Sequence, residues 1–383
     1  MGTESQLRRL AGGGRRSKNT PPIFSQEFII QNHGDILSCV VLLIFAGFMF
    51  QVTSPVAALF VSPQYNATRE NSDPPVMYYR NGLKDVATVI FYATCWIVGH
   101  AILQEYIIDK LQRKLHLSKI KTSKFTESGH LLLFSLYSVG HAAYVLNHEH
   151  YLPELSSLWT GYPRDHVEMS LRLKLFFLLQ ISYWLHQFPE FYFQKNKKEE
   201  IRSRSVYILL HLAFISFAYT LNFNRVALCI LLLHYVSETV FHAVRMAHFA
   251  DKTSITSTGF KLFNFLFVLV RLGCGILAFL TFWYGLRTSE VPTINIEEGN
   301  YNTTFIRLNS LLCVCGIQIY MMWNFITFHL RRMRESGASA AKQRYPLRNK
   351  QKKDKKKQEQ DYSHLTEADQ ETNRALRSAK KSN

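Results

Sequence analysis

The chain has 383 residues and a formal net charge of +17, from 45 Lys and Arg residues against 28 Asp and Glu residues. Its hydrophobic residues, 47% of the total, gather in long apolar blocks, whereas the segment 331–383 holds 16 basic and 7 acidic residues and very few aromatic ones. This uneven distribution excludes a single soluble globular core and a small secreted domain held together by disulfides.

Eight apolar blocks have the length of membrane-spanning helices. A helix needs about 20 mostly apolar residues to cross the hydrocarbon of a bilayer, because each residue adds about 1.5 Å. The blocks are too long for strands and lack alternating polarity, which favours helices. The predicted spans are Ile36–Val52, Val86–Tyr106, His130–Leu146, Leu171–Phe188, Val206–Leu221, Val226–His248, Phe260–Leu286 and Ile306–Leu330.

The basic residues between the blocks indicate an orientation. With eight spans, both termini lie on one side, together with the loops after spans two, four and six. These segments hold 35 of the 45 Lys and Arg residues. Because basic residues accumulate on the cytosolic side of membranes, the sequence predicts an all-α integral membrane protein with both termini in the cytosol.

Two glycosylation sequons agree with this orientation. Asn66-Ala67-Thr68 lies between spans one and two, and Asn302-Thr303-Thr304 lies between spans seven and eight. Eight spans place both loops on the side opposite the cytosol, where glycans are added. We therefore predict Asn66 and Asn302 as acceptors, with Asn302 the poorer one because it lies close to the last span.

The C-terminal segment 330–383 is predicted to be a basic, disordered cytosolic tail. Its run from Lys352 to Lys357 is typical of a solvated arm, or of a segment that contacts anionic lipid headgroups or ribosomal RNA phosphates. Lys380 and Lys381 are fourth and third from the end of the chain. A lysine pair at these positions is typical of a dilysine signal for retrieval to the endoplasmic reticulum.

Span six carries a stripe of ionisable residues. His234, Glu238, His242 and Arg245 follow one another at helical spacing on one face. Ionisable groups at this depth are costly unless they face the interior of the bundle or a cavity. Three interpretations stay open: a hydrogen-bonded network, a lining for a lipid headgroup or another amphiphile, and a metal or catalytic site. No other span is expected to offer a matching carboxylate–histidine pair of the di-metal type. Further interior polar residues are His100, Gln104, His141, Gln180, His186, His211 and Gln318.

Five stretches of the chain match a known family in order and spacing. They are Ser25–Asp35, Gln64–Thr68, Gln104–Lys110, Leu117–Gly129 and Tyr183–Gln194. Together they resemble the translocating chain-associating membrane protein family of the endoplasmic reticulum, over residues 21–334. The resemblance implies a cytosolic segment at 1–35, two spans at 36–115, and a TLC-type helical bundle of six spans at 116–329.

Ceramide synthases share the TLC domain, and their fifth span carries a histidine pair. Here Tyr219 and Arg225 fit the register of that span, which places Tyr207 and Ile208 where the two histidines are expected. The next motif in those enzymes is His-Asp at the start of an Asp-x-x-Asp run. Here His234 keeps the histidine, Tyr235 replaces the first acid, and Glu238 stands at the position of the second acid. Acyl transfer needs a general base aimed at the attacking amine. The resemblance therefore implies a non-enzymatic protein with no catalytic, metal or cofactor residues. In such a protein Tyr207 and His211 line a polar interior together with the span-six stripe.

The resemblance implies a function in protein transport across and into the endoplasmic reticulum membrane. The protein is expected to assist translocation of secretory proteins and membrane insertion of nascent chains at the Sec translocon. Expected partners are the translocon, the ribosome–nascent chain complex, signal sequences, transmembrane segments and membrane lipid, with no specific nucleic acid. The alternative is a lipid-binding protein or a lipid acyltransferase related to ceramide synthases. A transporter of small polar solutes is disfavoured because no internal repeat is visible.

Overall fold

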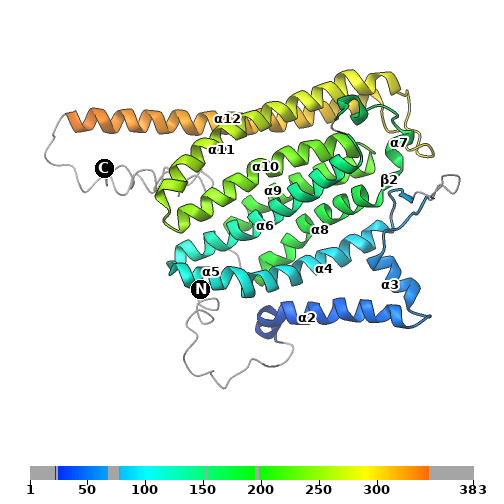
Figure 1. Ribbon diagram of the computed structural model, residues 1–383, viewed down its shortest axis with the longest axis horizontal. Helices are drawn as coiled ribbons and strands as arrows, with labels where there is room; N and C mark the ends of the chain where they lie inside the picture. Colours follow the sequence, from blue (N-terminus) through cyan, green and yellow to red (C-terminus); the bar gives the residue numbers. More distant parts are fainter. Residues whose placement is uncertain (1–21, 23–24, 68–76, 152, 195–197, 345–383) are drawn as a thin grey trace.

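Long helices lying side by side make up the computed structural model of the protein, which describes residues 22, 25–67, 77–151, 153–194 and 198–344 (Figure 1). The long helices are α2 (Gln26–Ala46), α4 (Asp85–Leu103), α6 (Lys119–His148), α8 (Leu171–Phe193), α9 (Lys198–Thr220), α10 (Asn224–Phe249), α11 (Thr253–Ala278) and α12 (Thr304–Arg344). The shorter elements are α3 (Ser54–Val61), α5 (Asp109–Leu115), α7 (Arg164–Val167), β1 (Tyr78–Tyr79), β2 (Met169–Ser170), the 3₁₀ turns η1 (Gly47–Met49), η3 (Leu155–Leu158) and η5 (Gly285–Ser289), and the π-helical turns η2 (Gln104–Ile108) and η4 (Phe279–Tyr284).

In the part of the chain that the structure describes, seven helices have the length and apolar composition of membrane spans, so the chain is a mostly helical multi-pass membrane protein. The candidate spans are Gln26–Met49, Asp85–Leu115, Lys121–His148, Ile201–Thr220, Asn224–Phe249, Thr253–Ser289 and Thr304–Glu335. Helix α8 occupies the place of predicted span four but carries Arg172, Lys174 and Glu190, and most of its residues face other helices. Most candidate spans extend beyond the predicted apolar blocks, because helices continue through polar turns at the membrane surface.

Local sequence signals explain where two helices begin. Ser25 starts α2, and its hydroxyl accepts a hydrogen bond from the Phe28 amide at 3.2 Å. Ser170 starts α8 in the same way, with the Leu173 amide at 3.3 Å. A serine at this position satisfies one of the backbone N–H groups that a helix leaves unpaired at its start.

The connections between helices gather at two opposite ends of the bundle (Figure 1). One end holds α3, α7, the two-stranded β1–β2 sheet and the loop before α12. The other end holds the start of α2, the turn from α5 into α6, and the α10–α11 connection. Successive long helices therefore run in opposite directions.

The core lies between α4, α6, α8, α9 and α10. Helix α8 contributes its largest share, including Phe176, Phe177 and Tyr183, none of which is exposed. Helices α2 and α12 form the outer edges of the bundle (Figure 1), and α2 has no buried residue. Their exposed apolar side chains, such as Leu43 (74% exposed) and Leu312 (72%), are suited to contact lipid.

Candidate functional site

The four residues of the predicted stripe on α10 make contacts with three neighbouring helices, α6, α9 and α11. His242 and Arg245 are buried, whereas His234 and Glu238 are partly buried. His234 contacts helices α9 and α11, Glu238 pairs with His242 on α10 itself, and Arg245 points to α6.

His234 belongs to a chain of hydrogen bonds that links three helices. Arg271 on α11 lies with its Nη2 atom 3.2 Å from His234 Nδ1, and His234 Nε2 lies 3.2 Å from His211 Nε2 on α9. His211 Nδ1 is 2.9 Å from the Tyr207 carbonyl oxygen. Because a guanidinium only donates and a carbonyl only accepts, the chain has one consistent direction. Arg271 donates to His234, His234 donates to His211, and His211 donates to the carbonyl, with both rings neutral.

The other two stripe contacts are ion pairs. His242 Nε2 lies 3.3 Å from Glu238 Oε2. Arg245 lies 3.7 Å from Glu127 on α6, and the same carboxylate is 3.2 Å from Arg204 on α9. The positive charge of Arg245 therefore compensates Glu127 and not Glu238, although the spacing on α10 would allow a contact with Glu238. Pairing of this kind is what makes charged groups tolerable inside a helical bundle.

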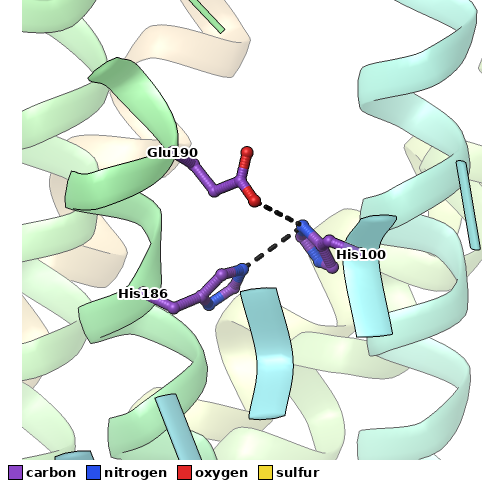
Figure 2. A group of neighbouring side chains, drawn as sticks. All are labelled: His100, His186 and Glu190. Atoms are coloured by element: carbon purple, nitrogen blue, oxygen red, sulfur yellow. Dashed lines mark hydrogen bonds and ion pairs between the residues drawn. The ribbon is translucent and has the colours of Figure 1, made fainter. Parts of the chain in front are cut away.

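A second cluster of histidine and carboxylate lies between α4 and α8, and the sequence did not predict it as a unit. Figure 2 shows His186 and Glu190 on α8 facing His100 on α4. All three side chains are buried, and one ligand atom from each lies within 4.8 Å of the others. The pair of His186 and Glu190 faces His100 on α4, so it is a cluster of its own and not a di-metal partner of the α10 stripe. The spacing of His186 and Glu190, four residues apart, places both on one face of a helix and could have indicated the cluster. A single histidine on a helix, however, is usually a core residue with its hydrogen bonds satisfied.

Buried polar contacts also tie the first loop to the bundle at the end that holds the β1–β2 sheet. Lys174, fully buried, lies 2.8 Å from Asp85, and the Tyr219 hydroxyl donates to the same carboxylate at 2.8 Å. Lys174 also donates to the Gln64 and Arg80 carbonyl oxygens, both at 2.7 Å. Three long helices, α4, α8 and α9, thus share one ionic network.

Arg225 holds the neighbouring loop. It donates to the Ser157 carbonyl at 2.8 Å and to the Asp165 carbonyl at 2.7 Å, with its guanidinium over the Tyr151 ring. Burial, with a smaller contribution from Arg225, lowers the pKa of His166 to about 3. His166 is therefore neutral, and its Nε2 donates to the Thr160 carbonyl oxygen at 3.1 Å.

The two predicted glycan acceptors differ in their surroundings. Asn66 is exposed and forms a β-bridge with Tyr79. Asn302 is fully buried, and its Nδ2 donates to the Leu286 carbonyl and to the Ser289 hydroxyl. The nitrogen that would carry a glycan is thus enclosed in the folded chain at Asn302. The predicted retrieval residues Lys380 and Lys381 lie outside the described residues.

Comparison with known proteins shows to which family the chain belongs. The family model of the TLC domain matches residues 124–327. "Translocating chain-associated membrane protein 2" of Mus musculus is 46% identical over 324 residues, which cover 84% of this chain and 86% of the relative. The Homo sapiens protein of the same name is 44% identical over 333 residues, 87% of this chain and 89% of the relative. The chain belongs to the translocating chain-associated membrane protein family.

The likeness to ceramide synthases is weaker and covers less of the chain. Human "Ceramide synthase 4" is 26% identical over 151 residues, 39% of this chain and 38% of the relative. At the positions expected for the histidine pair, the Tyr207 ring lies 4.3 Å from the His211 ring, and Ile208 is 3% exposed in the core. His211 stacks on Trp184 at 4.0 Å.

The residues of this chain that align with the ceramide synthase motifs therefore make structural contacts here. Tyr219 and Arg225 hold Asp85 and the loop described above. Tyr235, at the place of the first acid, accepts a hydrogen bond from the Trp184 indole and donates to Gln180 at 2.7 Å. Both ring nitrogens of His211 take part in hydrogen bonds, one with the Tyr207 carbonyl oxygen and one with His234.

Proposed function

We propose that the protein assists translocation of secretory proteins and membrane insertion of nascent chains at the Sec translocon of the endoplasmic reticulum. The observation that carries this proposal is the identity of 46% and 44%, over most of the chain, with proteins named for association with translocating chains. The proposed partners are the translocon, the ribosome–nascent chain complex, signal sequences and transmembrane segments.

The proposed topology has eight spans, with α8 as the fourth and with both termini in the cytosol. Two observations support it: the long helices alternate in direction (Figure 1), and the segments that the sequence predicts on the cytosolic side hold 35 of the 45 Lys and Arg residues. The end with Asn66 then faces the lumen.

The proposed mechanism uses the two outer helices as a surface for segments that leave the translocon. Leu42 and Leu43 on α2 and Leu312 and Ile319 on α12 are each about two-thirds exposed or more. A moderately apolar segment can pack against these helices in lipid, which lowers the free energy of its insertion. We further propose that the polar residues His234, Glu238, His242, Arg245, His211 and Tyr207 line an interior that perturbs nearby lipid. Tyr207, 41% exposed, lies at the outer end of the hydrogen-bonded chain.

Site-specific photocrosslinking tests the proposal. A photoreactive residue at Leu43 or Leu312 in ribosome-bound microsomes should crosslink a stalled nascent chain that carries a signal sequence. The same residue at Phe177, which is fully buried in the core, serves as the control and should give no crosslink. Crosslinks to lipid alone from both outer positions would overturn the proposed contact with nascent chains.

The alternative function is binding or acylation of a lipid, and the TLC match favours it as the second candidate. The purified protein should show no transfer of an acyl group from acyl-coenzyme A to a sphingoid base. If wild-type protein makes ceramide, and Glu238→Gln or His211→Ala abolishes that activity without loss of protein, the alternative replaces the proposal.

We also propose that Lys380 and Lys381 help to keep the protein in the endoplasmic reticulum. Replacing both by serine should move more of the protein to the Golgi, measured by imaging and by the maturation of its glycan. An unchanged distribution would mean that binding to the translocon alone retains the protein.

A further inference from the structure

The cluster of His100, His186 and Glu190 has the geometry of an incomplete coordination sphere. His186 Nε2 lies 3.3 Å from His100 Nδ1, and Glu190 Oε1 lies 3.9 Å from the same nitrogen. Two nitrogens bound to Zn²⁺ at about 2.0–2.1 Å in a tetrahedral site are about 3.3–3.4 Å apart. The two histidines therefore already have the spacing of zinc ligands, and a shift of about an ångström brings in the carboxylate.

Hydrogen bonds around the cluster fix the tautomer of His186 and the orientation of Glu190. His186 Nδ1 lies against the Tyr183 carbonyl oxygen, so this nitrogen carries the proton and Nε2 keeps its lone pair. Glu190 Oε2 accepts a hydrogen bond from Gln194 at 2.9 Å, which leaves Oε1 facing His100. Zinc-binding histidines and carboxylates are commonly oriented by such outer partners.

The burial of the Glu190 carboxylate also favours a bound cation. Its side chain is almost fully buried, and no Lys or Arg pairs with it in the part of the chain that the structure describes. Other acids inside the bundle differ: the buried Asp85 has Lys174, and the partly buried Glu127 has Arg204 and Arg245. A lone carboxylate away from water is costly in free energy unless it is neutralised or paired. A divalent cation would compensate it.

The neighbouring polar residues give the cluster further support. The His130 ring on α6 lies 4.3 Å from the His100 ring, and its Nε2 lies 3.1 Å from Gln104 Oε1. Gln104 begins the π-helical turn η2, an irregularity that often marks functional positions in helices. It also donates to Asp109. Three helices and a π turn thus fix the position of His100 and its surroundings.

We propose that His100, His186 and Glu190 bind one Zn²⁺ ion between α4 and α8. Two imidazole nitrogens and one carboxylate oxygen are a known catalytic-type ligand set for zinc, whereas Mg²⁺ and Ca²⁺ prefer oxygen ligands alone. The fourth position is left for water. The site joins the first two long-helix spans to the TLC segment, so bound zinc stabilises the packing of α4 against α8.

Metal analysis of the purified full-length protein tests the proposal. After incubation with Zn²⁺ and removal of free metal, mass spectrometry should find about one zinc per wild-type chain. Glu190→Gln and His100→Gln should each lose at least nine-tenths of that zinc. Glu190→Gln keeps the size of the side chain and the contact with Gln194, so it is expected to fold. A monodisperse elution profile checks that it does.

His141→Gln is the matched control. His141 is a partly buried helix histidine that contacts Tyr137 and the Arg172 carbonyl, away from the cluster. It should keep the zinc, and added zinc should raise its thermal midpoint as in the wild type, but not that of Glu190→Gln. X-ray absorption should show nitrogen or oxygen ligands at about 2.0–2.1 Å and no sulfur at about 2.3 Å. A wild-type protein without zinc, zinc retained by both variants, or sulfur ligation would overturn the site and leave a hydrogen-bonded network.

Discussion

Individual buried charges decide much of the local structure, and the Lys174–Asp85 pair is the strongest case. Lys174 is fully buried in this pair. Tyr219 donates a hydrogen bond to Asp85, and Lys174 donates to two backbone carbonyl oxygens. A buried cation is tolerated only when its partners replace the water it has lost. Lys174 has three oxygen partners, as many as an ammonium group can hold with its three protons.

Removing one member of this pair is expected to destabilise the protein. Lys174→Met leaves Asp85 buried with the Tyr219 hydroxyl and the Gly82 amide but without a cation. We expect a loss of about 3–5 kcal/mol of stability, seen as a clear fall of the thermal midpoint in detergent. Arg80→Gln is the control, because Arg80 pairs with Glu168 at the surface, 52% exposed, and should cost about 0–1 kcal/mol.

A second variant separates the ionic pair from packing. Adding Asp85→Asn to Lys174→Met removes the uncompensated charge, so the double variant should recover part of the lost stability. A double variant whose loss equals the sum of the two single losses would show that the two charges do not interact.

Glycosylation offers a prediction at the level of two residues. Asn66→Gln should remove the glycan, detected as a faster band that no longer responds to endoglycosidase, because Asn66 is exposed. Asn302→Gln should leave the band unchanged but lower the stability, because the Asn302 amide donates two buried hydrogen bonds. A glycan on Asn302 in mature protein would show that this loop differs from the structure.

The residue types of the interior could be predicted from the sequence, but their partners could not. The spacing on span six placed four ionisable residues on one face, as the helix requires. It could not show that Arg245 pairs with Glu127 or that His234 meets His211 and Arg271, because these contacts depend on how four helices rotate against each other. The cluster at His100 was missed for the same reason, since α4 and α8 are far apart in sequence.

At the scale of elements, α8 is the helix whose role depends most on its neighbours. Its charged residues make it a weak candidate by composition, yet twelve of its side chains are buried in the bundle. Charged residues near the centre of a membrane helix oppose insertion, and pairing with other helices offsets that cost. We therefore expect α8 to insert poorly alone and efficiently when α4 precedes it.

Two single substitutions test whether α8 spans the membrane. Leu155→Asn completes an acceptor with Ser156 and Ser157 before α8, and Lys198→Thr completes one at Asn196 after it. In an Asn66→Gln background, eight spans predict a glycan on the first variant and none on the second. Glycans on both variants would place the two ends of α8 on the same side, and the count would be seven.

At the scale of the whole molecule, the composition of each segment determines whether it spans the membrane, but not how the spans pack together. Apolar length and basic loops predicted a multi-pass helical protein, because the energetics of the bilayer act on each segment separately. They did not predict how the first two spans join the rest. Trp96 and Ser182 link α4 and α8 through the Leu179 and Val89 carbonyls, and the Asp85–Lys174 pair lies in the same interface.

These contacts predict that the segment from residue 116 onward does not fold without α4. A chain that lacks residues 1–115 loses two proposed spans, so the orientation of the remaining helices is unchanged. It nevertheless exposes Lys174, Ser182 and His186, which are fully buried in the whole protein and contact residues before 116. We expect this fragment to aggregate and to be degraded, measured by its abundance and by size-exclusion chromatography. A chain that lacks residues 346–383 should accumulate normally, because the helix contacts described above all lie before residue 345. Co-expression of residues 1–115 as a separate chain should restore the fragment, since the contacts with α8 are packing and hydrogen bonds rather than covalent links. A stable, monodisperse fragment without that partner would show that the TLC segment folds by itself and that α4 only docks on a finished core.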